Sequence, residues 1–135
     1  MHVATQFSIF LINKPGVLAT VTGALSKAGV NLNALALMDS GEHGALRIVC
    51  DDAAKTREVL AKTHDRWTET QVLVTELSNR PGSFAGVART LTEAGVNITY
   101  AYFSAEPQGG KTTAVLKVAD TEKAMQVLDA AQEKT

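Results

Sequence analysis

The sequence predicts an α+β fold in which two βαββαβ units follow one another, each an antiparallel sheet with helices on one face. Two observations predict it. The segment Asn-Lys-Pro-Gly at 13–16 returns at 79–82 as Asn-Arg-Pro-Gly, and Ala-Gly-Val-Asn at 28–31 returns at 94–97, both 66 residues later. Each copy also shows strand and helix patterns in the order β-α-β-β-α, which is that of a split βαβ, ferredoxin-like sandwich. The duplication therefore predicts two similar units.

The first copy begins with a strand and a helix that meet at a Pro-Gly turn. Residues 5–12 are rich in β-formers, and three alternating apolar side chains share one face: Phe7, Ile9 and Leu11. Pro15 and Gly16 break this strand. Apolar residues at helical spacing then predict a helix that ends at Gly29: Leu18, Val21, Leu25 and Ala28.

A hairpin and a second helix follow in the first copy. Strands at 32–39 and 45–51 flank a turn that contains Gly41 and Gly44. Asp52 is a suitable N-cap for a helix that presents Thr56, Val59 and Leu60. Residues 67–72 can supply a fourth strand that runs directly into the second copy.

The second copy repeats this order. Its elements are a strand at 72–77, a helix at 84–94, strands at 98–104 and 112–118, and a helix capped by Asp120. We expect one domain at residues 1–69 and another at 70–135. The sequence stops at Thr135, inside or just beyond the last helix, so this copy has no fourth strand of its own. Because exposed strand edges are rarely left uncovered, we expect another segment or chain at that edge.

Composition excludes several classes of function. The chain has 135 residues, a net charge of −1 and one cysteine, which argues against nucleic-acid binding, membrane binding, disulfides and multi-cysteine zinc sites. The first residues lack the features of a signal peptide, and no stretch approaches the ~18 apolar residues of a membrane helix. We expect a cytoplasmic protein.

The repeated motif resembles the ACT domain, a small regulatory module that commonly binds amino acids. Two copies of Asn-x-Pro-Gly, each followed at the same spacing by Ala-Gly-Val-Asn, carry the resemblance over nearly the whole chain. It implies a stand-alone tandem ACT protein with no catalytic domain attached. The first half is also similar to the regulatory subunit of acetolactate synthase.

The motif has a chemistry that suits an amino-acid ligand. Gly16 and Gly82 let the backbone turn sharply and let a ligand approach closely. The helix that follows presents unpaired N–H groups and a partial positive charge, which favour a carboxylate. Asn13 and Asn79 can each donate and accept hydrogen bonds, as a zwitterion requires. We therefore expect binding through loops 13–18 and 79–84.

The resemblance adds the asparagines that follow Ala-Gly-Val, so that the expected ligand-binding residues are Asn13, Lys14, Pro15, Gly16, Val17, Leu18, Asn31, Asn79, Arg80, Pro81, Gly82, Ser83, Phe84 and Asn97. The alternative is that these asparagines are turn residues without a ligand. Some relatives carry a histidine two positions before the motif asparagine. Leu11 and Leu77 stand there in this chain, which argues against a serine-like ligand and favours a more apolar wall.

The expected function is a non-catalytic regulatory protein that binds a free amino acid at ACT–ACT interfaces and forms a homodimer. The alternative is a regulatory subunit that acts mainly by binding an enzyme of amino-acid metabolism, such as acetolactate synthase. No cofactor and no metal are expected, because phosphate-binding loops, nucleophile motifs and histidine spacings for metal ligation are missing. Cys50 shares a strand face with Leu46 and Ile48, which favours a buried structural thiol.

Overall fold

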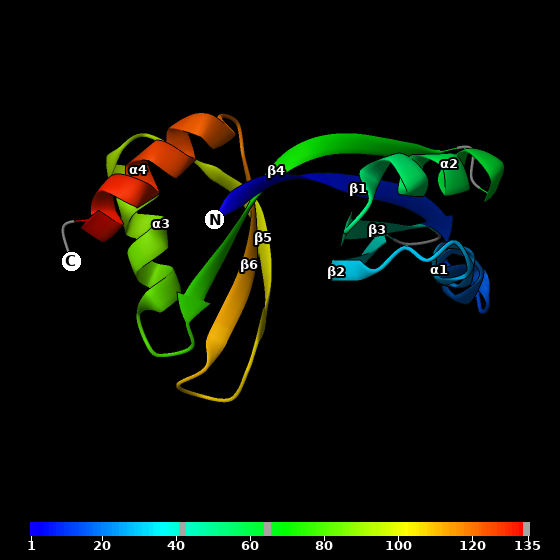
Figure 1. The fold of residues 1–135 in the computed structure, drawn as a ribbon, viewed down its shortest axis with the longest axis horizontal. Coiled ribbons are helices and arrows are strands. Elements are labelled where there is room, and N and C mark those ends of the chain that lie inside the picture. Colours follow the sequence, from blue (N-terminus) through cyan, green and yellow to red (C-terminus); the bar gives the residue numbers. More distant parts are fainter. Residues whose placement is uncertain (41–42, 64–65, 134–135) are drawn as a thin grey trace. The chain divides into compact units, whose positions relative to one another are not determined.

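The computed structural model describes residues 1–40, 43–63 and 66–133 (Figure 1). The chain divides into two compact units. The first unit is Thr5–Thr70, and the second is Gln71–Thr135 together with Met1–Ala4. Both combine an antiparallel sheet with two helices, so the predicted α+β fold is confirmed. The predicted turn residue Gly41 lies outside the described residues.

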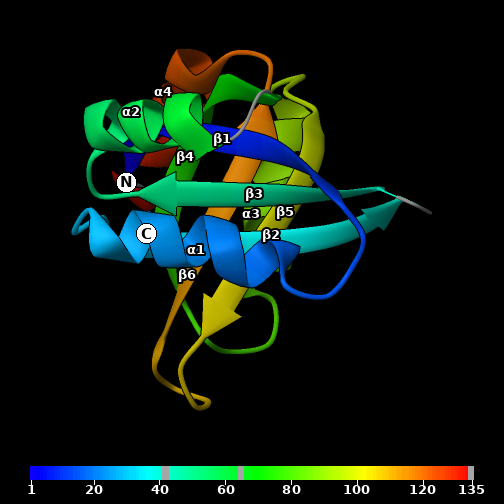
Figure 2. The same cartoon turned by 90° about the vertical axis from the view of Figure 1, so that its right-hand side faces the viewer.

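The first unit has the strand order of a split βαβ sandwich. Its elements are most of β1 (His2–Ile12), α1 (Val17–Lys27), β2 (Leu32–Ser40), β3 (His43–Cys50), α2 (Ala53–Thr63) and the beginning of β4 (Trp67–Ser78). The hydrogen-bonded order is β2-β3-β1-β4, and β3 runs antiparallel to both of its neighbours. Figure 2 shows α1 and α2 on the same side of these strands. Strand β2 is therefore an edge strand.

The core of the first unit lies between these helices and the sheet. It contains the three alternating residues expected from the sequence, Phe7, Ile9 and Leu11, all buried. The helices and β3 contribute the other fully buried side chains: Val21, Leu25, Leu46, Ile48 and Leu60. Period-two and helical spacing thus identified the residues that are removed from water.

The predicted caps of the second helix in each unit are confirmed. Asp52 Oδ1 accepts a hydrogen bond from the backbone N–H of Lys55, and Asp120 Oδ1 accepts one from the N–H of Lys123, both at 3.0 Å. Each bond satisfies an N–H of the first helical turn that has no partner within the helix. Gly29 follows α1 with φ +79°, as a left-handed residue after a helix C-terminus requires.

The second unit is built from the rest of β4, α3 (Ser83–Glu93), β5 (Ile98–Ala105), β6 (Lys111–Val118) and α4 (Thr121–Glu133). Its strand order is β4-β6-β5, with β6 antiparallel to both neighbours. Helices α3 and α4 lie together on one side of these strands (Figure 1). Leucine and valine side chains from both layers form its core, including Leu73, Leu91, Leu116, Val118 and Leu128.

The N-terminal end of β1 belongs to the second unit. The sequence expectation assigned residues 70–135 alone to this domain and no fourth strand to its sheet. Strand β1 begins at His2 rather than at residue 5 and lies beside β4 in the hydrogen-bonded order. Since Met1–Ala4 cluster with the second unit, the beginning of β1 takes the fourth-strand position there. This segment covers the edge that the sequence alone leaves open.

No helix among the described residues is long and apolar enough to span a membrane.

Truncating a core leucine of the second unit should destabilise the protein strongly. Leu91 is fully buried between α3 and the sheet, so Leu91→Ala should lower the free energy of unfolding by about 2–5 kcal/mol. The neighbouring exposed residue provides the control, because Thr92→Ala should change it by less than about 0.5 kcal/mol. Urea denaturation measures both, and equal losses would contradict this assignment of the core.

Candidate functional site

The two motif loops share one backbone geometry. Gly16 and Gly82 both have φ +90° and stand immediately before the first residues of α1 and α3. Residues other than glycine rarely adopt this backbone conformation. Steric contact is not the reason for glycine here, because no atom lies within 4 Å of a Cβ built at either position. The backbone N–H groups of Thr20 and Gly86 donate to the carbonyls of Gly16 and Gly82 at 3.0 and 2.9 Å. The glycines thus set the angle at which each strand passes into its helix.

In the first unit, this loop borders a cavity of about 260 Å³. The cavity lies between the end of β1, the start of α1 and the end of the edge strand β2. Among the predicted residues, Asn13, Lys14 and Leu18 line it. The other lining residues are Leu11, Ile12, Leu37, Met38, Asp39 and Gly44. Its walls therefore combine an amide, an ammonium group and a carboxylate with apolar side chains.

In the second unit, two aromatic rings occupy the corresponding place. The repeat aligns Leu18 with Phe84 and Leu37 with Phe103. The rings of Phe84 and Phe103 pack with their centroids 5.6 Å apart and their planes tilted by 32°. Such a pair stabilises the contact between the start of α3 and strand β5.

The Asn79 side chain has a structural partner. Its Nδ2 donates to the carbonyl of Glu106 at 2.5 Å. The Asn79 backbone accepts from Gly109 N–H at 2.9 Å and donates to the Gly110 carbonyl at 2.7 Å. Asn79 thus holds the turn between β5 and β6.

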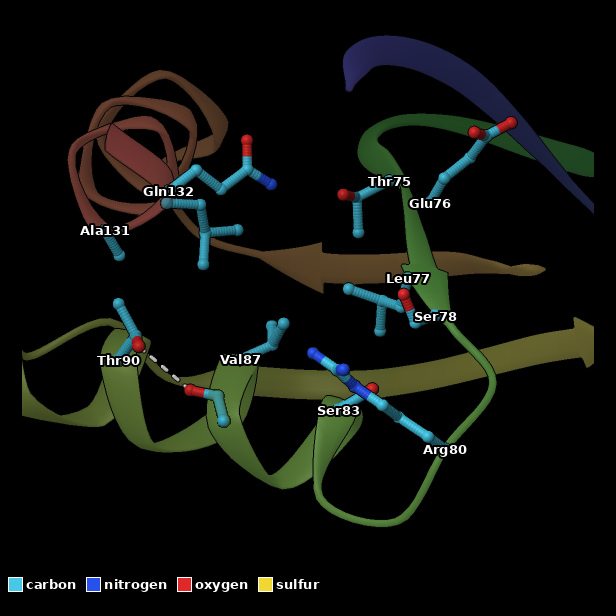
Figure 3. A pocket seen from close by; sticks show the side chains of 12 residues that line it. Thr75, Glu76, Leu77, Ser78, Arg80, Ser83, Val87, Thr90, Ala131 and Gln132 are labelled. Atoms are coloured by element: carbon cyan, nitrogen blue, oxygen red, sulfur yellow. Dashed lines mark hydrogen bonds between the residues drawn. The ribbon is translucent and has the colours of Figure 1, made fainter. Parts of the chain in front are cut away.

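Arg80 and Ser83 line a different cavity in the second unit. It measures about 430 Å³ and lies between the end of β4 and the helices α3 and α4 (Figure 3). Sequence reasoning selected Arg80 and Ser83 but missed Thr75, Thr90 and Gln132, which also line it. An alignment of the two copies could have pointed to Thr75 and Thr90, because polar threonines stand there in place of the apolar Ile9 and Ala24.

Comparison with known proteins identifies the family. A family model described as an ACT domain pair matches residues 1–133. The chain belongs to the ACT domain pair family. The structure of protein BT0572 from Bacteroides thetaiotaomicron has a TM-score of 0.89 and 34% identity over 96% of this chain and 89% of that chain. A search of curated proteins returns no match.

Two further structures share the fold of this ACT pair. The regulatory subunit of aspartate kinase from Thermus thermophilus has a TM-score of 0.71 and 17% identity, covering 98% of this chain and 96% of that chain. The aspartokinase alpha and beta subunits give a TM-score of 0.64 and 20% identity, covering 98% of each chain. At these identities the likeness shows the fold alone.

The asparagines that follow Ala-Gly-Val lie away from both ACT cavities. Asn31 comes after the C-terminal end of α1, and an 11-residue helix spans roughly 16 Å. Its backbone N–H donates to Asp51 Oδ1 at 2.9 Å, and its side chain donates to Asn33 at 3.1 Å. Asn97 occupies the corresponding position after α3. Neither residue lines either cavity.

The described part of the ACT pair contains no group of three or more His, Cys, Asp or Glu residues that could hold a metal ion. His64, one of the three histidines, lies outside the described residues. Cys50 is half-buried at the end of β3 and packs against the core of the first unit. Burial raises the pKa of its thiol, a hydrogen bond with Thr56 opposes this rise, and the negative charge of Asp51 adds to it.

Cys50 should react slowly with iodoacetamide at neutral pH. A raised pKa leaves less thiolate at any given pH, and the thiolate is the nucleophile. We expect slower alkylation at pH 7 than in the same chain in urea, with a rate that is still rising at a pH where a free thiol has reached its maximum. Mass spectrometry follows the single cysteine directly. Equal rates for folded and unfolded chains at pH 7 would show that Cys50 is not protected.

Proposed function

We propose that this ACT pair is a non-catalytic regulatory protein that binds a free L-amino acid in the cavity of its first unit. One observation carries the proposal. Asn13, Lys14 and Asp39 line a single cavity beside the glycine turn. A zwitterion needs an acceptor for its ammonium group and a donor for its carboxylate, and these side chains supply both.

The remaining walls favour an apolar side chain on the ligand. Leu11, Leu18 and Leu37 line the same cavity. Leu11 stands where some relatives have a histidine, so it replaces a polar group with an apolar one. The first turn of α1 contains no acidic residue, and no side chain caps it. Its N–H groups therefore favour a carboxylate at this end of the cavity.

The second motif loop supports a structural role rather than a second copy of this site. Phe84 and Phe103 pack together where the first unit has leucines. Asn79 is engaged with the turn between β5 and β6. We therefore propose one amino-acid site of this kind per chain. This chain shares its fold with a structure described as the regulatory subunit of aspartate kinase. This likeness supports a regulatory role.

Two variants test the amino-acid site by calorimetry against the twenty amino acids. Asn13→Ala should weaken binding by about 1.5–3 kcal/mol, roughly ten- to 150-fold, because it removes a hydrogen bond to a charged ligand. The double variant Leu18→Phe/Leu37→Phe should abolish binding. It should still fold, since the second unit accommodates the same aromatic pair at the corresponding positions.

Asn97→Ala is the matched control, because Asn97 lines neither cavity. Its affinity should equal that of the unmodified chain. Absence of heat with every amino acid, or unchanged affinity in Asn13→Ala and in the double variant, would overturn the proposal. A loss confined to Asn97→Ala would place the site in the second unit.

We also propose that a second copy of the chain packs against β2. Three large apolar side chains on this edge strand are exposed: Leu35, Leu37 and Met38, at 44%, 51% and 48%. Because β2 is an edge strand that also borders the amino-acid cavity, a partner there would cover both. Ligand binding would then favour the associated form.

Sedimentation at low micromolar concentration should give a mass near twice 14.3 kDa. Leu35→Glu should shift the protein toward a monomer, because it places a charge in the proposed interface. Leu35 does not line the cavity, so the contacts of the bound amino acid within one chain stay intact. A monomer at all concentrations, with and without ligand, would contradict the dimer and favour an enzyme as the partner at this edge.

A further inference from the structure

We propose that the second ACT unit contains a separate site for a small aliphatic carboxylate that carries no ammonium group. The site is the cavity between the end of β4 and the helices α3 and α4. It does not depend on the amino-acid site of the first unit, because the two cavities have no lining residue in common. Three features support this site: the guanidinium of Arg80, the hydroxyl of Thr75 and the size differences between the two copies.

Arg80 supplies the positive charge. Figure 3 shows its side chain running from the motif loop past Ser83, with the guanidinium directed into the space between β4 and α3. No carboxylate among the described residues pairs with it. Glu76, the acidic residue that lines the cavity, lies 3.4 Å from Lys111 Nζ and points away from Arg80. A planar guanidinium without a partner suits a carboxylate, which it binds through two parallel hydrogen bonds.

Thr75 supplies a buried polar group inside the cavity. The residue is only 3% exposed, and it lines the cavity. Figure 3 shows its side chain beside the open space of the cavity. A hydroxyl that opens onto a cavity can donate a hydrogen bond to a ligand or to water there.

The two copies differ in size at several positions that line this cavity. At positions aligned by the repeat, the first unit has Ile9, Val17 and Thr20, and the second has Thr75, Ser83 and Gly86. Each of these three residues of the second unit is smaller than its counterpart, whereas Thr90 is larger than Ala24. Ile9 is fully buried in the first core, whereas the corresponding position in the second unit faces a cavity of about 430 Å³. The three smaller side chains therefore contribute space to this cavity.

The remaining walls define the class of ligand. Apolar side chains from β4, α3 and α4 line the cavity: Leu77, Val87, Leu128 and Ala131. They suit a short aliphatic chain, while Arg80 and Ser83 suit its carboxylate. An α-ammonium group would lie close to the guanidinium and would have no carboxylate directed toward it. The site should therefore distinguish a carboxylic acid from the corresponding amino acid.

Isovalerate, isovaleramide and L-valine form a matched set of probes, because they share a carbon skeleton and differ in charge. We expect isovalerate to shift the backbone amide signals of Ser83, Gly86 and Thr90 in NMR titrations of the full chain. Isovaleramide and L-valine should bind there at least about tenfold more weakly. The backbone amide signals of Asn13 and Lys14 report separately on binding to the amino-acid site of the first unit.

Arg80→Gln should weaken isovalerate binding at least about tenfold without altering the fold, because Arg80 is exposed and pairs with no carboxylate of the described ranges. Gly86→Leu should block the cavity, because Gly86 lines it. The helix should tolerate the new side chain, since a Cβ at Gly86 meets no atom within 4 Å. Gly23→Leu is its control, because Gly23 is also a helical glycine with open space and lines neither cavity. Asn13→Ala should leave isovalerate binding unchanged.

No saturable shift with isovalerate, or equal binding of isovalerate and isovaleramide, would overturn the proposal. Equal affinity of Arg80→Gln and the unmodified chain would overturn it as well. The Arg80 variant remains decisive if Gly86→Leu fails to fold. Since these outcomes concern signals of the second unit, they are distinguishable from a failure of amino-acid binding in the first.

Discussion

A glycine with positive φ at the junction of a strand and a helix is the constraint on which both units depend. Gly16 and Gly82 share φ +90°, and each fixes how a core strand turns into the helix that covers it. The same turn leaves N–H groups of the first helical turn without side-chain caps. The glycine turn thus sets the packing of strand and helix in each ACT unit, and it places these N–H groups at one end of a cavity.

Side chains around this shared backbone make the two units different. In the first unit, Leu18 and Leu37 leave space next to Asn13 at the sheet edge. In the second, Phe84 and Phe103 fill the corresponding place, while Thr75 and Gly86 open a cavity on the side covered by the helices. The duplicated fold therefore keeps its core, while the cavities of the two units are lined by different sets of elements.

The sequence predicted the fold well because the relevant signals are local. Alternation at Phe7, Ile9 and Leu11, and the capping residues Asp52 and Asp120, determine strands and helix starts without distant partners. The place of the fourth strand could not be predicted in the same way. The first residues of β1 join a unit whose other members begin at Gln71, and such a pairing is far apart in sequence.

The lining of the first cavity was predicted only in part, because its residues also come from segments that are far apart in the sequence. The motif pointed to Asn13 and Lys14, which line the first cavity. Because the motif is repeated, it also predicted the same role for Asn79 as for Asn13. Only the structure shows the bond from Asn79 to Glu106 and the aromatic pair beside it. A motif conveys which groups are available, whereas a cavity depends on the volumes of side chains from several elements.

A crystal structure with the amino acid that calorimetry identifies would show where this ligand binds. We expect one ligand per chain, bound in the first unit against Asn13, Lys14 and Asp39, with Phe84 and Phe103 still packed together in the second. An amino acid bound between the Asn79 loop and β5, with the two rings separated, would contradict it.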